Sequence, residues 1–437
     1  MRTERNRVFE FLDHYGMNYA KIDMQEYCDR FLAEMKRGLE GTSASLAMLP
    51  TFIEAEREIP LNERVIVIDA GGTNLRTGIL YFDAAGQAVI ENFSKRPMPG
   101  STGTVNKTEF FDAFAAALQG LTDQCSAIGF CFSYPVRMLA SKDGRMMRFS
   151  KQIQAKAVEG ELLVANFRAA LQRNGYRSDH RIALLNDTVA TLLAGKTVSR
   201  DRAFDSYVGF ILGTGTNSCY IEQNAAIHKE PGLDPARTQI INVESGGFGQ
   251  GPSGRIDRDF DRTTVDPDYY TFEKMISGRY LGGVCGQVIK QAAADGLFTA
   301  ETAAKLGQLP ELNTLTVNQF LCQPDRTHHP LGAALAAGTA ANRTILYYLL
   351  DSMVERAAKL AAINLAAMVL KADKGSRPDR PVCITADGTT FYQMKGLRFK
   401  TEYYLQQFLV ERNQRFFEIV NVDNAPLIGA AVAGLIG

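Results

Sequence analysis

The chain has 437 residues, enough for two domains that each bury a sizeable hydrophobic core. Lys and Arg number 48 together, as do Asp and Glu, so neither nucleic acid nor an anionic membrane is an expected partner. No stretch reaches the roughly 18–20 apolar residues of a membrane-spanning helix, and we see no apolar run typical of a secretory signal. Seven scattered cysteines without a C-x-x-C pair indicate reduced thiols and a cytoplasmic protein.

The first 40 residues show helical spacing of apolar side chains. Between Asn6 and Leu39 the pattern predicts two helices that are separated near Gly16. The following apolar segment, Met48–Ile53, contains Pro50, so we expect an extended crossing there rather than a helix.

The most informative stretch is Val65–Phe82. A β-branched run leads to Asp69, a turn of sequence AGGTN follows at 70–74, and a second extended run begins at once. This order predicts a strand, a tight turn and a second strand. The two glycines allow backbone N–H groups to face an anion, because no Cβ blocks the approach. A plain hairpin turn is the alternative that this motif alone leaves open.

The next elements are a helix over Thr108–Leu121, a short buried strand over Ala127–Phe132 and an amphipathic helix over Glu161–Gln172. The strand ends in Ser133-Tyr134-Pro135. A polar residue followed by proline at a strand end is found at ligand-binding loops, and an ordinary turn explains it equally well.

A buried strand at Ile182–Leu185 ends in Asn186 and Asp187, and a helix of small residues is expected over Thr188–Gly195. A carboxylate between a strand and a helix start is a favoured place for chemistry in α/β proteins. The alternative is that Asp187 only caps the helix.

A second hairpin is predicted over Ser206–Glu222, where the turn reads GTGTN. Its tripeptide Gly215-Thr216-Asn217 repeats Gly72-Thr73-Asn74 at the same point of the same motif. Two such hairpins suggest an internal duplication with one polyphosphate held between two related lobes. Chance similarity of two glycine turns is the alternative.

The remaining chain continues to alternate strands and helices. We expect a strand at Gln239–Val243 that ends in Glu244, a helix over Phe272–Leu281 and two short helices within Thr299–Gln323. A long alanine-rich helix is expected over Asn342–Leu370.

The C-terminal region adds two strands and a helix. The strand Pro381–Thr385 leads into a third small-residue turn, and the last strand is expected over Phe416–Val422. The helix Ala425–Gly437 consists of small residues, which would allow backbones to approach closely.

In this order, the motifs resemble those of the hexokinases of the actin-like ATPase fold over nearly the whole chain. FEKMISG and GTGTN followed by CY are specific to hexokinases rather than to the wider superfamily. The matching blocks are MLPTF (48–52), DAGGTNLR (69–76), FSYP (132–135), SK (150–151), VEG (158–160), LLNDT (184–188), GTGTNSCYIE (213–222), NVESGGFG (242–249), FEKMISGRYLG (272–282) and ADGT (386–389).

The resemblance implies an α/β, ribonuclease H-like fold that is duplicated into two lobes with a cleft between them. The small lobe would comprise residues 61–187 and 423–437, and the large lobe residues 1–60 and 188–422. Closing one lobe on the other would exclude water from the reaction.

The resemblance also implies an ATP-dependent hexokinase that phosphorylates the 6-hydroxyl of a hexose, D-glucose in the first place, to give glucose 6-phosphate for glycolysis. Asp187 would be the general base, and Lys151 would neutralise phosphate charge. The sugar would be bound by Ser133, Ser150, Lys151, Asn186, Asp187, Asn217, Glu244 and Glu273.

ATP would lie against the three small-residue turns, and Mg²⁺ would bridge its phosphates through water near Asp69 and Asp187, with no direct protein ligand. The implied nucleotide contacts are Asp69, Gly71, Gly72, Thr73, Asn74, Arg76, Gly213, Thr214, Gly215, Thr216, Asp387, Gly388 and Thr389.

The sequence departs from the family pattern at several positions. Leu75 replaces the usual phenylalanine, Ser150 replaces threonine, and Ser245 replaces a tryptophan, which would alter the cleft wall. Residues Asp423–Gly429 lack the usual Gly-Ser-Gly-Lys run, which puts adenosine contacts there in doubt.

Two other functions remain open: a catalytically silent sugar sensor of the same fold, and a different actin-like ATPase. Retention of Asp187, Lys151 and both hairpins argues against the sensor. The sugar-binding set argues against the generic ATPase.

The expected partners are a hexose and ATP, and the expected state is a monomer or homodimer. The order of preference among hexoses, and a donor other than ATP such as a polyphosphate, stay open.

Overall fold

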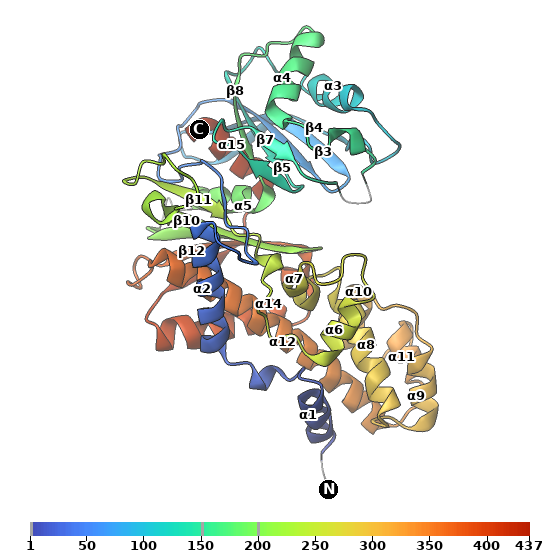
Figure 1. Ribbon diagram of the computed structural model, residues 1–437. Helices are drawn as coiled ribbons and strands as arrows, with labels where there is room; N and C mark the ends of the chain where they lie inside the picture. Colours follow the sequence, from blue (N-terminus) through green and yellow to red (C-terminus); the bar gives the residue numbers. More distant parts are fainter. Residues whose placement is uncertain (1–2, 150–152, 199–201) are drawn as a thin grey trace.

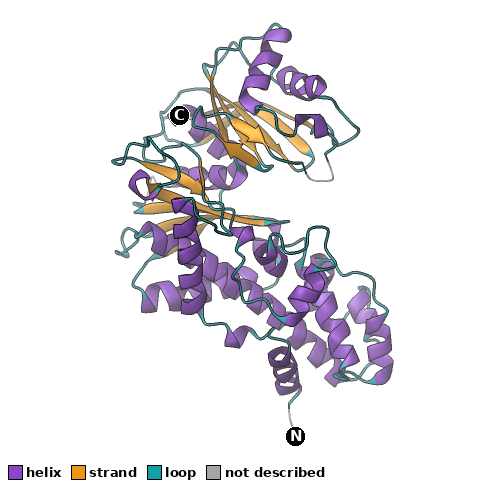
Figure 2. Cartoon of the chain, viewed as in Figure 1, coloured by secondary structure: helices purple, strands orange, loops and turns teal. Residues whose placement is uncertain are grey.

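The computed structural model describes residues 3–149, 153–198 and 202–437. It contains two twisted β-sheets that are covered by helices, with the first helix at the end of the helical region and the C-terminus near the first sheet (Figure 1). Figure 2 shows that most helices gather on the side of the second sheet that faces away from the first. Within the described part of the chain we find no helix whose length and hydropathy would let it traverse a bilayer.

The first sheet has the strand order β4-β3-β2-β5-β8. Its strands are β2 (Val65–Gly71), β3 (Asn74–Phe82), β4 (Ala88–Pro97), β5 (Ala127–Phe132) and β8 (Arg181–Leu185). The second sheet has the order β1-β11-β10-β9-β12-β13. Its strands are β1 (Leu49–Pro50), β9 (Ser206–Leu212), β10 (Thr216–Gln223), β11 (Thr238–Asn242), β12 (Val382–Asp387) and β13 (Phe417–Val420). A separate ribbon joins β6 (Val136–Met138) to β7 (Gly144–Met146).

The helices connect and cover these strands. They are α1 (Glu4–His14), α2 (Met24–Glu40), α3 (Lys107–Ala117), α4 (Leu163–Arg173), α5 (Asp187–Gly195), α6 (Arg255–Asp261), α7 (Thr271–Ile276), α8 (Leu281–Ala294), α9 (Ala300–Gly307), α10 (Thr314–Cys322), α11 (Pro330–Ala334), α12 (Ala340–Ala372), α13 (Thr389–Gln393), α14 (Leu397–Leu405) and α15 (Ala425–Ile436). Short 3₁₀ turns lie at Tyr19–Lys21, Lys156–Val158, Lys196–Val198, Asn224–Ala226 and Ser245–Gly247, and a π-helical turn at Gln406–Arg412 extends α14.

The two sheets repeat one topology. In each, three consecutive antiparallel strands are followed by two strands that run parallel to the first of them. Thus β2, β3, β4, β5 and β8 correspond in order to β9, β10, β11, β12 and β13, and β1 extends only the second sheet. This correspondence confirms the internal duplication that the two glycine hairpins predicted.

We call the first sheet with α3 and α4 the small lobe, and the second sheet with α2 and α12 the large lobe. Each has a hydrophobic core, built around the phenylalanines of α3 and β5 in the small lobe and around α12 in the large lobe. A third cluster contains α5, α15 and residues of both sheets, so these two helices lie between the lobes.

Three glycines bring the backbones of this central layer into contact. A Cβ on Gly129 of β5 would lie 1.8 Å from the carbonyl oxygen of Ala430 in α15. A Cβ on Gly429 would lie 1.9 Å from the Ala190 oxygen in α5, and one on Gly209 of β9 would lie 2.4 Å from the Thr188 oxygen. The close approach predicted for the C-terminal helix is therefore confirmed, and α5 is fixed at the junction of the lobes.

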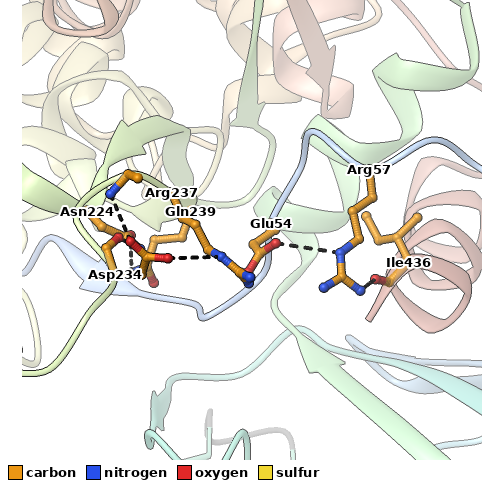
Figure 3. A network of polar contacts seen from close by, with 8 residues as sticks. Glu54, Arg57, Asn224, Asp234, Arg237, Gln239 and Ile436 are labelled. Atoms are coloured by element: carbon orange, nitrogen blue, oxygen red, sulfur yellow. Dashed lines mark hydrogen bonds and ion pairs between the residues drawn. The ribbon is translucent and has the colours of Figure 1, made fainter.

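The segment between β1 and β2 crosses from the large lobe to the small lobe. Figure 3 shows its polar anchors. Glu54 pairs with Arg237 of the large lobe at 2.7 Å and with Arg57 at 3.5 Å, and Arg57 donates to the Ile436 carbonyl of α15 at 3.0 Å. The crossing is thus tied both to the second sheet and to the central helix layer.

Most predicted elements are present, with one clear error. The helix expected over Phe272–Leu281 is broken, because α7 ends at Ile276 and α8 begins at Leu281. The Gly278 N–H donates to the Gly213 carbonyl at 2.8 Å, and a Cβ at this glycine would lie 2.2 Å from Thr390 Oγ1. The chain leaves the helix here to contact the second hairpin.

Candidate active site

Asp187 is the first residue of α5, and only Asn186 separates it from the end of β8. The helix cap is the neighbouring Asn186, whose side-chain oxygen accepts from the N–H groups of Thr188 at 2.8 Å and Val189 at 3.3 Å. Asp187 is therefore not the cap itself, and its carboxylate accepts from Thr188 N at 2.7 Å through one oxygen. The described residues make no hydrogen bond to the second carboxylate oxygen, so this oxygen can accept from a ligand.

The electrostatic surroundings make Asp187 a stronger base than an ordinary aspartate. Burial raises its pKa to about 7, with further increases from the charges of Glu244 and Asp69, while hydrogen bonds from Thr188 oppose the shift. A carboxylate with a pKa near neutrality is suited to accept a proton from a substrate hydroxyl.

Glu244 is held by two asparagines. Its Oε1 accepts from Asn242 Nδ2 at 2.8 Å and from Asn217 Nδ2 at 3.3 Å, and Asn217 also donates to Asn242 Oδ1 at 2.8 Å. Sequence reasoning found Glu244 and Asn217 but not Asn242. No local spacing rule marks Asn242, because this residue ends β11 and Glu244 lies beyond the strand with a left-handed backbone.

Glu273 connects the same group to the second hairpin. Its Oε2 accepts from Thr216 N at 2.9 Å, and a Cβ on Gly215 would lie 2.6 Å from this oxygen. Burial raises the Glu273 pKa to about 7, the Thr216 N–H lowers it, and the charge of Glu244 raises it. The charge of Glu244 thus disfavours the ionised form of Glu273.

Ser133 lies against the first hairpin. Its N–H donates to the Ala70 carbonyl at 3.0 Å, and a Cβ on Gly71 would lie 2.6 Å from its Oγ. Next to it, Arg76 pairs with Asp69 at 3.4 Å across the strands β2 and β3. The tip of this hairpin, Gly72-Thr73, is exposed.

The charge of Asp387 in the third turn affects the pKa of Asp69. Burial raises its pKa to about 6, Arg76 lowers it, and the charge of Asp387 raises it. A Cβ on Gly388 would lie 2.3 Å from the Leu212 carbonyl, and Thr390 Oγ1 donates to Gly213 O at 2.8 Å. The third turn therefore packs against the second hairpin and lies within electrostatic range of the first.

Between the lobes, next to this group, lies a small, mainly apolar cavity of about 20 Å³. Its walls come from both lobes, with Leu49 and Asn242 on one side and Phe132, Leu185 and Asn186 on the other. The polar residues described above therefore surround the place where the lobes meet.

Ser150 and Lys151 lie outside the described residues. The expected effect of Ser245 on the cleft wall is wrong, because its side chain is fully buried and Oγ accepts from Asn364 Nδ2 of α12 at 3.2 Å. The Ser245 N–H in turn donates to Asn217 Oδ1 at 3.2 Å, so this residue supports the site from behind.

The remaining predicted residues lie together. Hydrogen bonds, close glycine contacts and mutual electrostatic effects connect Ser133, Asp69, Asp187, Asn217, Glu244 and Glu273 with the three turns. Within the described parts of the chain, no group of three or more His, Cys, Asp or Glu side chains is arranged to hold a metal ion directly.

Comparison with known structures establishes the fold. The chain superposes on a hexokinase from Schistosoma mansoni complexed with glucose with a TM-score of 0.75, at 22% identity, covering 98% of this chain and 99% of the other. A second hexokinase crystal structure gives a TM-score of 0.78, at 22% identity over 99% of both chains. The fold is therefore the two-lobed actin-like ATPase fold of the sugar kinases, as the sequence indicated.

Sequence relatives agree with this result. Hexokinase-5 of Oryza sativa subsp. japonica is 30% identical over 86% of this chain and 78% of its own length, and human Hexokinase-3 is 29% identical over 90% of this chain. The chain spans less than half of the mammalian relatives, 43% in the human case. Two hexokinase family models match residues 10–197 and 207–436, which together cover nearly all of the sequence. The chain belongs to the hexokinase family.

Proposed function

We propose that this protein is an ATP-dependent hexokinase, which transfers the γ-phosphoryl group of ATP to the 6-hydroxyl of D-glucose. The observation that carries the proposal is the setting of Asp187. Its pKa is raised to about 7, and the two charges that add to the effect of burial come from Glu244 on the sugar side and Asp69 on the phosphate side. A base in this position lies between the two substrates.

In the proposed reaction, Asp187 takes the proton of the 6-hydroxyl while the sugar oxygen forms its bond to the γ-phosphorus. The bond from this phosphorus to the β–γ bridging oxygen breaks, and ADP leaves. Glu244, Glu273, Asn217, Asn186 and Ser133 hold the sugar, because carboxylates and amides match hydroxyls that are both donors and acceptors. The sequence resemblance adds Ser150 and Lys151 to this set.

We assign the phosphates to the two hairpins, around Gly71–Asn74 with Arg76 and around Gly213–Thr216. The third turn, Asp387–Thr389, is assigned to the adenosine. The acidic pair Asp69 and Asp187 fits a hydrated Mg²⁺, because the charge of Asp69 raises the pKa of Asp187 and a cation near both carboxylates would relieve that repulsion. Bound Mg²⁺ would neutralise phosphate charge.

We also propose that residues 61–187 with 423–437 move as one body against the rest when sugar binds. Closure would exclude water, which would otherwise hydrolyse ATP without forming the sugar phosphate.

A cytoplasmic location is proposed because six of the seven cysteines are buried free thiols, which suits a reducing compartment. The proposed partners are a hexose and ATP, with a monomer or homodimer as the working state.

The test is the initial rate with Mg·ATP on glucose, mannose, fructose, glucosamine and N-acetylglucosamine, for the wild type and Asp187→Asn. We expect glucose turnover that the substitution lowers at least a thousandfold, with glucose affinity changed less than fivefold. Wild-type kcat/KM should fall as pH drops below 7, because Asp187 becomes protonated.

Glucose binding without turnover of any sugar would overturn the kinase proposal and identify a sugar sensor. ATP binding without any effect of a sugar would leave a generic ATPase of this fold. Full activity of Asp187→Asn would reject Asp187 as the base and leave the kinase assignment standing.

A further inference from the structure

Tyr270, the residue before α7, contacts Glu244, which we assign to the sugar site. Its hydroxyl donates to Glu244 Oε2 at 2.6 Å, whereas the two asparagines occupy the other oxygen, Oε1. Burial, with the negative charge of Glu244, raises the pKa of the Tyr270 hydroxyl, so it remains a donor. Both carboxylate oxygens are thus held from the protein side, and Oε2, which accepts only from Tyr270 among the described residues, keeps a lone pair for a ligand.

The backbone at both partners is strained. Glu244 has φ 57° and ψ 49°, and Tyr270 has φ 52° and ψ 43°, which is the left-handed region that residues other than glycine rarely occupy. A Cβ on Gly246 would lie 3.0 Å from Tyr270 Cδ1, so the glycine makes room for the ring. Strain of this kind gathers at functional sites, where surrounding contacts enforce it.

The loop that carries Tyr270 has its own anchor. The buried ammonium of Lys274 contacts the Asp261 carboxylate and donates to the Asp266 carbonyl at 2.6 Å. The other oxygen of Asp261 accepts from Asp268 N at 2.8 Å. This network holds residues 266–270 in place from the large-lobe side.

The same loop reaches the small lobe. The ring of Tyr269 packs on that of Tyr270 with centroids 4.5 Å apart, and the guanidinium of Arg148 lies 5.0 Å from the Tyr269 centroid. Arg148 Nη1 also lies 4.0 Å from Asp266 Oδ2. Arg148 belongs to the small lobe, since it follows β7 and precedes Phe149, which packs against the small-lobe core.

A continuous path of contacts therefore runs from the small lobe through Arg148, Tyr269 and Tyr270 to a carboxylate in the sugar site. We propose that Tyr270 is a positioning residue that orients Glu244 for the sugar, and that Arg148 on Tyr269 couples this orientation to the approach of the two lobes. The inference rests on the proposed function only in taking Glu244 as a sugar ligand.

Its test is calorimetric titration of D-glucose into the full chain, which reads binding whether or not the protein turns sugar over. We expect Tyr270→Phe to bind glucose about tenfold more weakly, which is the loss expected for a hydrogen bond to a charged group. The KM for glucose should rise by a similar factor, while kcat and the KM for ATP stay within about twofold. Effects of this pattern separate positioning from general damage to the fold.

Tyr15→Phe is the matched control. Tyr15 also donates its hydroxyl to a carboxylate, Asp295 Oδ2, at 2.8 Å, but this pair lies among the helices of the large lobe. The same chemical change should leave glucose affinity unchanged there. Glucose affinity of Tyr270→Phe equal to that of Tyr15→Phe would overturn the positioning role.

The coupling is tested by a double-mutant cycle. Arg148→Met keeps much of the side-chain length and removes the charge at an exposed position, and it should weaken glucose binding about threefold. If Arg148 acts through Tyr270, adding Arg148→Met to Tyr270→Phe changes affinity no further. Independent effects that multiply in the double variant would overturn the coupling.

The outcome also separates this inference from the proposed function. Wild-type protein that binds glucose without phosphorylating it contradicts the kinase assignment, while the affinity of Tyr270→Phe still decides the positioning role. Wild-type turnover with unchanged binding in Tyr270→Phe contradicts the inference alone. Wild-type protein that binds no hexose contradicts both.

Discussion

At the residue scale, the carboxyl group of Asp187 links the chemistry of the site to the stability of the fold. Its pKa rises from 3.8 to about 7 on folding, chiefly through burial, so the folded protein holds the proton more tightly than the unfolded chain. The contribution of this group to stability is therefore present below pH 4 and is lost as the pH rises through 7.

We accordingly expect the stability of Asp187→Asn, measured relative to that of the wild type, to increase when the pH is raised from 4.5 to 8. The relative gain should be on the order of 2 kcal/mol, about half of the full conversion of the shift because the residue is partly exposed. Urea unfolding at the two pH values measures it. Parallel stability curves for the two proteins would show that Asp187 has an ordinary pKa in the folded state.

Individual site residues differed in how far they could be predicted. Asp187 and Glu244 lie at strand ends, where a local pattern marks them, and Asn217 repeats a residue of the first hairpin. Tyr270 has no such local pattern. Its position depends on its left-handed backbone and on Gly246, about 25 residues earlier, whose missing side chain leaves room for the ring. Contacts that a distant backbone creates have no signature in local spacing.

At the element scale, the close packing of α15 against its neighbours depends on glycine. Gly429→Ala would place a Cβ 1.9 Å from the Ala190 oxygen, and neither backbone can shift without moving α5. We expect a loss of roughly 2–4 kcal/mol in the free energy of unfolding, measured by urea denaturation. Gly307→Ala is the control, because a Cβ there meets nothing within 4 Å, and it should be neutral or slightly stabilising.

The C-terminal turn of the same helix is held by two arginines. Arg57 donates to the Ile436 carbonyl at 3.0 Å, and Arg181 donates to the Gly434 carbonyl at 2.9 Å (Figure 3 shows the former). The last carbonyls of a helix lack intrahelical partners and carry partial negative charge, so cationic donors stabilise them.

We therefore expect Arg57→Gln and Arg181→Gln each to lower the free energy of unfolding by about 1 kcal/mol. Arg181→Lys should lose less, because it keeps the charge. Increased hydrogen exchange confined to the last turn of α15 would accompany the loss. An unchanged exchange rate in that turn would show that the arginines do not support it.

Elements were predictable where the apolar residues repeat at one regular spacing, as in the strands of the two hairpins and in α12. The expected helix over Phe272–Leu281 failed because Gly278 donates to the second hairpin, a tertiary contact that overrides local helix propensity. The small ribbon of β6 and β7 was also missed. Its strands have three residues each, too short for alternation to be recognised.

At the scale of the whole molecule, the duplicated topology places one glycine hairpin in each lobe. The central helices α5 and α15 lie between the sheets, and Asp187 begins one of them. Repetition of the tripeptide GTN was enough to suggest the duplication. The layering of sheet, α15, α5 and sheet was not predictable, because it depends on contacts between backbones far apart in the sequence.

This arrangement predicts that sugar binding stabilises both lobes together. The proposed sugar ligands directly follow β5 and β8 in the small lobe, and in the large lobe they lie on β10, on α7 and just after β11. Glucose at 100 times its dissociation constant should add about 2.7 kcal/mol to the free energy of unfolding in one cooperative transition. Asp187→Asn should retain most of this gain, because asparagine removes the base but keeps a polar side chain of the same shape in the sugar site. Thermal unfolding with and without glucose measures it, and L-glucose serves as the control. Stabilisation of only one of two separable transitions would show that the sugar contacts a single lobe, contrary to a site at their junction.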